Sequence, residues 1–279
     1  MTISGVPEHF NLPWHLCLEN GDFKKAGLDV TWTDVPEGTG KLCQMLRSGE
    51  TDVAVILTEG IIKDILAGNP SKIVQVYVES PLIWGIHVSA QSKYQHVSEL
   101  QNTTAAISRN GSGSQLMAYV NAENQGWPKD NLKFEIVHTI DGAVEALQNG
   151  RADYFMWERF MTKPLVDNGT FRYVSDCPTP WPCFVIAVRS EILEDNSENI
   201  ETLLSVVNNM TSKLKEMEGI DLILSQRYGQ KQDDIRQWLS LTQWSQSNFT
   251  ESVLNNIQNQ LADLGIIDKK GTFADIAHG

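Results

Sequence analysis

A chain of 279 residues is long enough to form one large domain or two modest ones. Its 41% hydrophobic and 20% charged residues are typical of an ordinary globular protein. No apolar run approaches the roughly 20 residues that cross a bilayer, so direct membrane insertion is not expected. The formal net charge of -13 argues against nucleic acid and acidic membrane surfaces as partners, because both usually require a basic face.

Predicted strands and helices alternate up to residue 188, which indicates the α/β fold class. In chain order the first elements are a strand at 2–6, a helix at 13–25, a strand at 28–35, a helix at 41–48, a strand at 53–57, a helix at 61–66, and strands at 73–78, 82–88 and 103–108. They are followed by a helix that is opened by 109–114 and runs to about 125, a strand at 134–138, a helix at 141–148, a strand at 154–157, a short helix at 162–166, and strands at 171–174 and 184–188. Beyond residue 197 only helices are predicted, at 197–217, 221–228, 233–244 and 250–264.

One pattern, Leu-x-x-Gly-x-x-Asp, occurs twice, at 46–52 and at 147–153, and a short hydrophobic run follows each copy. The pattern predicts a helix that ends at a glycine, a tight turn and a buried strand. Such junctions are common in any α/β protein, but two copies with the same spacing favour two similar lobes.

Polar residues follow both hydrophobic runs, where an open α/β sheet exposes its ligand sites at the carboxyl ends of the strands. Thr58, Glu59 and Gly60 follow the first run, and Glu158 and Arg159 follow the second. The two glutamates are therefore expected to face each other across one ligand cleft.

Two strands are predicted to carry the chain between the lobes, at 82–88 and 184–188. Lobe one would consist of 1–84 together with 189–279, and lobe two of 85–188. Two crossing segments make a hinge, and a hinge allows two lobes to close over a small ligand.

The doubled pattern, a serine-rich helix start at 108–114 and the closing segment 261–267 together carry a family resemblance over nearly the whole chain. The chain resembles the type 2 periplasmic-binding-protein-like family, in particular the branch of nitrate, sulfonate, taurine and thiamine-pyrimidine-precursor binding proteins. The resemblance implies a two-lobed α/β fold with two hinge-crossing strands and a helical C-terminal segment.

The resemblance also implies the function: a substrate-binding protein that closes on a small organic ligand and serves the membrane component of an ABC transporter. An aminopyrimidine related to thiamine and a small organic anion are the two ligand classes that it suggests. A cytoplasmic enzyme of cofactor biosynthesis on the same fold is the alternative, with His9 or Glu59 as general base, although a binding protein without turnover is favoured. The cysteine-rich motif of the fungal enzymes that build the thiamine pyrimidine has no counterpart here.

The family's ligand-binding positions fall in five segments of this chain. They are His9, Asn11 and Trp14 after the first strand, Thr58, Glu59 and Gly60 after the first copy of the pattern, Ser108, Gly111, Ser112, Gly113 and Ser114 at the serine-rich helix start, Trp157, Glu158 and Arg159 after the second copy, and Trp181 near the second crossing.

The chemistry of these residue types suggests what each segment binds. The glycine-serine turn offers N–H groups and hydroxyls at the positive end of a helix, which suits a carboxylate, sulfonate or phosphate, although a serine there can also simply cap the helix. Glu59 and Glu158 suit an amine or aminopyrimidine, and Arg159 or Arg109 suits an anion. Four tryptophans could stack against a flat ring or belong to the core, namely Trp14, Trp84, Trp157 and Trp181.

No catalytic set, metal site or cofactor motif is evident in the sequence. His9 and His15 do not have the spacing of a helical metal pair. Cys177 and Cys183 could close a small disulfide loop, but structural thiols are favoured. Residues 1–30 contain no signal peptide, so the sequence as it stands predicts a cytoplasmic protein; removal of a signal segment would make it periplasmic or membrane-anchored.

Overall fold

The computed structural model describes residues 1–278, which form two compact units. The first unit consists of Met1–Pro81 and the residues from Trp181 onward, and the second unit is Leu82–Pro180. The chain thus passes between the units twice, at 81/82 and at 180/181, whereas the sequence placed these boundaries at 84/85 and 188/189.

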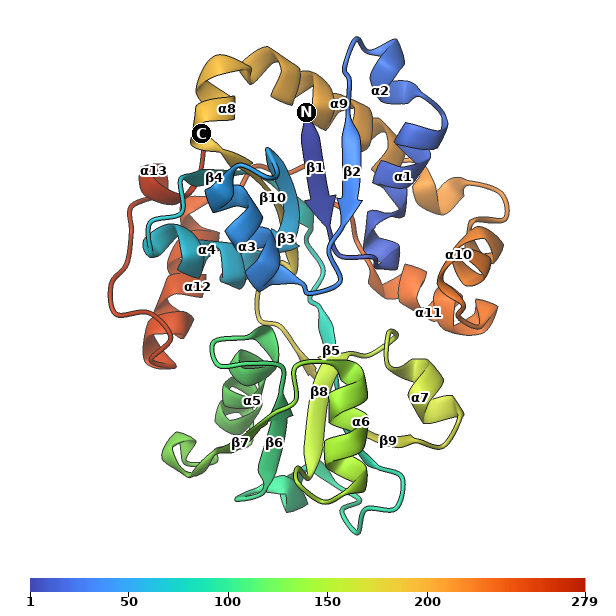
Figure 1. The fold of residues 1–279 in the computed structure, drawn as a ribbon, viewed down its shortest axis with the longest axis vertical. Helices are drawn as coiled ribbons and strands as arrows, with labels where there is room; N and C mark the ends of the chain where they lie inside the picture. The colour runs from blue at the N-terminus through green and yellow to red at the C-terminus, as the bar shows by residue number, and fades with distance from the viewer. Residues whose placement is uncertain (279) are drawn as a thin grey trace. The chain divides into compact units, whose positions relative to one another are not determined.

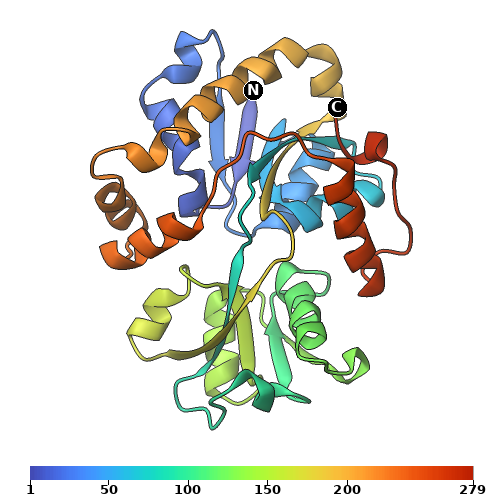
Figure 2. The same cartoon turned by 180° about the vertical axis from the view of Figure 1, so that it is seen from behind.

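The first unit is built on a five-stranded mixed sheet (Figures 1 and 2). Its strand order is β2 (Thr31–Asp34), β1 (Thr2–Gly5), β3 (Val53–Leu57), β10 (Phe184–Arg189) and β4 (Ser71–Val78). β1 is parallel to β2 and β3, and β10 is antiparallel to both β3 and β4. Because β10 has a partner on each side, it belongs to the sheet of the first unit rather than to lobe two, where the sequence placed it.

The second unit repeats this sheet position by position. Its strand order is β7 (Lys133–Ile136), β6 (Thr104–Ile107), β8 (Tyr154–Glu158), β5 (Ile83–Ser89) and β9 (Phe171–Pro178). β6 is parallel to β7 and β8, and β5 is antiparallel to β8 and β9. In each sheet the fourth strand is the first one after a passage between the units. The segments predicted as crossings, 82–88 and 184–188, are therefore these inner strands, β5 and β10, and the passages precede them.

Helices flank both sheets. In the first unit they are α1 (Leu12–Glu19), α2 (Asp22–Lys25), α3 (Thr39–Ser48), α4 (Thr58–Leu66), α8 (Ser190–Asp195), α9 (Ser197–Thr211), α10 (Ile220–Tyr228), α11 (Gln232–Leu241), α12 (Glu251–Asp263) and α13 (Phe273–Ile276), with short 3₁₀ turns at His9–Asn11 and Leu214–Glu216. In the second unit they are α5 (Gly113–Asn124), α6 (Ile140–Gln148) and α7 (Lys163–Asp167), with 3₁₀ turns at Val97–Leu100 and Lys129–Asn131. No helix within residues 1–278 is both long enough and apolar enough to cross a bilayer.

Three helical predictions need correction. The helix predicted at 13–25 is two helices, because Gly21 takes a left-handed φ of 69° that ends the first. The helix predicted at 197–217 ends at Thr211, and the one predicted at 233–244 ends at Leu241. Beyond that last end the chain becomes extended, and Trp244 forms an isolated bridge with Val78.

The glycine of the doubled pattern ends a helix in both copies, as the sequence predicts. Gly49 and Gly150 have φ values of 76° and 68°, a backbone region that costs side-chain-bearing residues energy. The N–H of Glu50 donates to the carbonyl of Met45 at 3.0 Å, and the N–H of Arg151 donates to the carbonyl of Ala146 at 2.9 Å. The two turns therefore reverse the chain by the same hydrogen-bond pattern.

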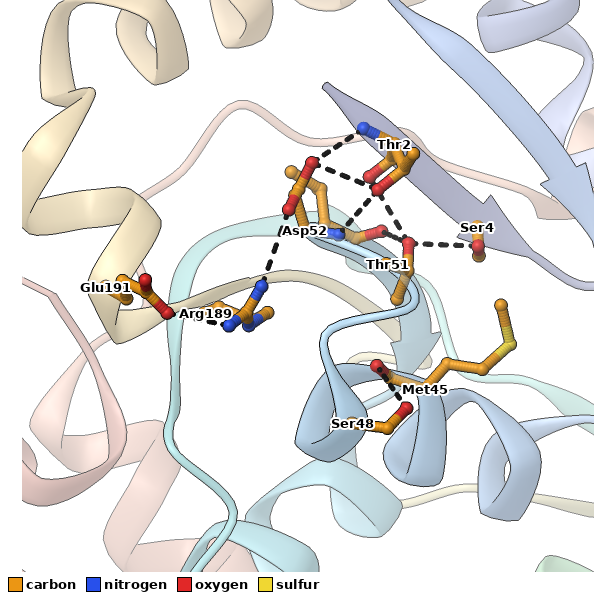
Figure 3. Close-up of polar contacts among 9 residues, drawn as sticks. Thr2, Ser4, Met45, Ser48, Thr51, Asp52, Arg189 and Glu191 are labelled. Atoms are coloured by element: carbon orange, nitrogen blue, oxygen red, sulfur yellow. Dashed lines mark hydrogen bonds and ion pairs between the residues drawn. The ribbon is translucent and has the colours of Figure 1, made fainter.

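The aspartate of the pattern joins two parallel strands (Figure 3). Asp52 accepts a hydrogen bond from the backbone N–H of Thr2 at 2.8 Å, and its own N–H donates to the carbonyl of Thr2 at 3.0 Å. In the second copy, Asp153 accepts from the N–H of Thr104 at 2.9 Å and donates to its carbonyl at 2.8 Å. The recurring aspartate thus fixes β3 against β1, and β8 against β6, which is a structural role.

Candidate functional site

The carboxyl end of β3 and the amino end of β10 meet at one edge of the first sheet, because the two strands are antiparallel and Phe184 lies opposite Leu57. Thr58 is the first residue of α4 at this edge, and it forms hydrogen bonds with the segment that precedes β10. Its N–H donates to the carbonyl of Cys183 at 3.1 Å, and its hydroxyl donates to the carbonyl of Pro182 at 2.6 Å. The segment that enters the first unit is therefore held at the start of α4.

Glu59 and Trp181 form a buried hydrogen bond at the same edge. The indole Nε1 of Trp181 donates to Oε2 of Glu59 at 2.8 Å, and the two residues are 2% and 4% exposed. Burial raises the pKa of the Glu59 carboxyl to about 7, although bonds from its own backbone N–H and from Trp181 oppose the rise. Near neutral pH this carboxyl is therefore present in both its protonated and its ionised form. The protonated form can donate a hydrogen bond as well as accept one.

The structure gives three other predicted residues of the first unit packing or turn roles. A Cβ on Gly60 would lie 2.3 Å from Cγ2 of Thr39, so this glycine permits α3 and α4 to approach. Trp14 is fully buried and its ring lies 6.1 Å from that of Phe23, within the core. Asn11 closes the loop after β1 by donating from Nδ2 to the carbonyl of Val6 at 2.8 Å.

His9 lies in an aromatic cluster after β1. Its imidazole stacks on the ring of Trp238, with centroids 4.1 Å apart and 12° between the planes, and the rings of Phe10 and Tyr228 lie at 5.1 and 5.9 Å. The residue is fully buried, and burial lowers its pKa to about 3, so the ring is neutral at physiological pH. The sequence did not single out Tyr228 or Trp238.

The backbone around His9 is held from two sides. The carbonyl of Phe10 accepts from the hydroxyl of Tyr77 at 2.8 Å and from Nε1 of Trp244 at 3.1 Å. Glu8 precedes this turn, and burial raises the pKa of its carboxyl to about 7. The loop therefore presents its side chains from a fixed backbone.

Three serine side chains gather where β6 leads into α5 in the second unit. Ser112 caps the helix by accepting from the N–H of Gln115 at 3.3 Å. The hydroxyl of Ser114 lies 3.0 Å from that of Ser112 and accepts from the N–H of Ser108 at 3.0 Å. All three serines are buried. The cap predicted as an alternative to a ligand site is present, and the serine cluster (Ser108, Ser112 and Ser114) also places hydroxyls at the positive end of a helix.

Both glycines of this turn contribute backbone N–H groups. Gly111 has a φ of 73° and its N–H donates to Oε1 of Gln115 at 2.6 Å. Gly113 is the first residue of α5, so its N–H is among those that a helix cannot satisfy internally.

The end of β8 carries the remaining predicted residues. Glu158 is 4% exposed, and its carboxylate accepts from the N–H of Met161 at 2.7 Å. Arg159 pairs with Asp176 at 3.0 Å. Trp157 packs against the core of the second unit, and its ring lies 6.1 Å from that of Trp84. The charge of Arg159 is thus balanced by Asp176, so the serine cluster is the better candidate anion-binding site of this unit.

Comparison with known proteins shows what this arrangement is similar to. Residues 84–177 match the family model described as "Ca3427-like PBP". The structure of the Candida albicans CA3427 gene product, which defines a family with the generic periplasmic binding protein fold, has a TM-score of 0.89 and 25% identity, over 97% of this chain and 92% of that one. The chain therefore has the periplasmic-binding-protein fold.

Two bacterial proteins of this fold are also similar in structure. The alkanesulfonate-binding protein SsuA of Xanthomonas axonopodis pv. citri, bound to MOPS, has a TM-score of 0.84 and 16% identity, over 100% of this chain and 98% of that one. The periplasmic nitrate-binding protein NrtA of Synechocystis PCC 6803 has a TM-score of 0.71 and 15% identity, over 96% and 82%. A comparison with curated proteins gives no match. These two similarities concern the fold, which is that of periplasmic binding proteins.

Among the described residues, this periplasmic-binding-protein-like chain has no group of three or more His, Cys, Asp or Glu side chains able to hold a metal ion. Cys177 is a free, buried thiol that receives a hydrogen bond from Nδ2 of Asn124 at 3.7 Å. Burial raises its pKa to about 12, which makes it a poor nucleophile.

Proposed function

We propose that the protein is a solute-binding protein that closes its two units over a small organic ligand with an anionic group. The observation that carries this proposal is the buried serine cluster at the start of α5. Helix N–H groups and hydroxyls at a positive helix end bind anions well. The fold that the chain shares with SsuA, an alkanesulfonate-binding protein, and with NrtA, a nitrate-binding protein, supports the same proposal.

In this proposal the first unit supplies the second set of contacts. Glu59 and Trp181 lie at the carboxyl edge of its sheet, where open α/β sheets hold their ligands. The protonated Glu59 carboxyl can donate to a ligand acceptor while it keeps its bond from Trp181. An aminopyrimidine is the second candidate ligand class, because the ionised carboxylate of the same residue would accept from its amino group. The membrane component of an ABC transporter is the proposed protein partner.

The test compares two helix caps that differ in location. Ser112→Ala removes the cap of α5, and Thr139→Ala removes the cap of α6, where Thr139 accepts from the N–H of Gly142 at 3.1 Å. Loss of either cap costs about 1 kcal/mol of folding stability, so the two variants should be destabilised by the same amount.

Calorimetric titration with methanesulfonate, nitrate, acetate and 4-aminopyrimidine then identifies the ligand class. We expect an anion to bind, and Ser112→Ala to weaken it about tenfold while Thr139→Ala leaves it unchanged, since a hydrogen bond to a charged group is worth about 1.5–3 kcal/mol. X-ray scattering should show a smaller radius of gyration with the anion bound. Equal affinities of the two variants, or binding of the aminopyrimidine alone, would contradict the anion seat.

A further inference from the structure

The aromatic cluster around His9 contains buried polar atoms that nothing in the described chain satisfies. Nδ1 and Nε2 of His9, Nε1 of Trp238 and the hydroxyl of Tyr228 have no hydrogen-bond partner within residues 1–278. His9 is fully buried and Trp238 is 1% exposed. The ring contacts of His9 with Trp238 and with Tyr228 place all four atoms in one cluster, formed by the loop after β1 and helices α10 and α11.

Leaving such atoms unpaired is costly for a folded protein. Each buried donor or acceptor without a partner costs about 1–3 kcal/mol, and buried polar groups are therefore nearly always hydrogen-bonded. Four orphaned atoms in one cluster indicate that a polar group from outside the chain hydrogen-bonds there. The doubly held carbonyl of Phe10 fixes the backbone next to His9, which is what a preformed recognition site requires.

The cluster also specifies the charge of that group. The imidazole of His9 is neutral, so it offers one donor and one acceptor, while the Trp238 indole only donates and the Tyr228 hydroxyl does both. An anion such as a carboxylate only accepts hydrogen bonds, so it would leave the unprotonated ring nitrogen of His9 unsatisfied. A cation would leave the Trp238 donor unsatisfied. An uncharged group that both accepts and donates satisfies all four atoms.

We propose that His9, Tyr228 and Trp238 form a subsite for an uncharged, planar group that donates and accepts hydrogen bonds, of the primary-amide class. This inference rests on the proposed function, since the subsite would bind a further group of the small organic ligand. The carbonyl oxygen of the amide accepts from Nε1 of Trp238, and its amino group donates to the unprotonated ring nitrogen of His9. The Tyr228 hydroxyl provides the remaining donor or acceptor.

Three small probes of nearly the same shape test this proposal: acetamide, acetate and acetamidinium, which are neutral, anionic and cationic. Each is titrated into the ¹⁵N-labelled full chain while the indole N–H signals of its eight tryptophans and the ring nitrogen signals of its six histidines are recorded. Trp238→Phe and His9→Phe identify the two reporter signals. Acetamide is expected to shift both signals, and the two charged probes are expected to leave them in place.

Tyr228→Phe provides the matched variant, with Tyr154→Phe as its control. Both tyrosines have a buried hydroxyl without a partner in the described chain, but Tyr154 lies in β8 of the second unit. We expect Tyr228→Phe to weaken acetamide binding about threefold or more, the equivalent of one neutral hydrogen bond, and Tyr154→Phe to leave it unchanged. If acetamide shifts neither reporter, or if a charged probe shifts them equally, the subsite is refuted.

The same titration separates this inference from the proposed function. Acetate binding that is lost in Ser112→Ala, without any acetamide effect at His9, overturns only the amide subsite. Acetamide binding at His9 without any acetate binding at the start of α5 overturns only the proposed anion seat.

Discussion

The stability of the protein should depend on the protonation of Glu59, and Glu59→Gln isolates this dependence. The glutamine keeps the shape of the side chain and an oxygen that can accept from Trp181, but it does not titrate. Because the pKa of Glu59 rises from 4.5 to about 7 on folding, the folded chain holds this proton more tightly than the unfolded chain. The wild-type protein is therefore most stable, relative to the variant, below pH 4.5, and it loses that advantage as the pH rises to about 7.

The expected size of the effect follows from the two pKa values. A tenfold difference in proton affinity corresponds to about 1.4 kcal/mol, so the full difference between 4.5 and about 7 amounts to about 3 kcal/mol. About 2.5 kcal/mol of this difference falls between pH 5 and pH 8, where the fold can be studied without acid denaturation.

Urea unfolding of both proteins at several pH values from 5 to 8 measures the effect. The quantity to follow is the difference in free energy of unfolding between Glu59→Gln and wild type, because groups common to both proteins, such as Glu8, cancel. Glu251→Gln is the control, since Glu251 also stands in the first turn of a helix after a threonine but is exposed. A difference that stays constant from pH 5 to pH 8 would show that Glu59 is not the buried acid described here.

Three further changes test the framework that positions the site. Gly142→Ala should cost 2 kcal/mol or more, since the new Cβ would lie 2.0 Å from the carbonyl oxygen of Val137; calorimetric melting would measure it, and an unchanged melting temperature would disprove the clash. Asp153→Ala should cost about 2 kcal/mol, because the first N–H of β6 loses its charged acceptor; urea unfolding measures this loss, and a cost below about 0.5 kcal/mol would contradict the structural role of the repeated aspartate. Tyr77→Phe should cost about 1 kcal/mol by removing one of the two donors to the carbonyl of Phe10, again measured with urea, and no loss of stability would mean that the loop does not depend on this bond.

The sequence predicted much of the fold because its strongest signals are local. The doubled Leu-x-x-Gly-x-x-Asp pattern places helix, turn and strand within a dozen residues, and both copies fold as expected. The same pattern could not show that its aspartate binds the start of a strand about 50 positions earlier in the chain, as Asp52 and Asp153 do.

The candidate site was less accessible to sequence reasoning, because its parts come from distant segments. Trp181 and Glu59 are 122 positions apart, and nothing in the local pattern of either residue identifies the other. Trp238 reads as an ordinary apolar position of an amphipathic helix, and its stacking on His9 exists only after the chain has returned to the first unit. Spacing shows which face of a helix is buried, but it does not show which side chain that face meets.

The position of β10 between β3 and β4 has a consequence for how the chain is made. β10 is the last strand of the chain to be synthesised, so until residues 184–189 have emerged, β3 and β4 each present an unpaired edge. The second unit, by contrast, is one continuous segment and has all five of its strands by residue 178. The second unit can thus fold on the ribosome before the first unit has all the strands of its sheet. Unpaired strand edges promote association between chains, so this interval is when the nascent protein most needs protection from aggregation.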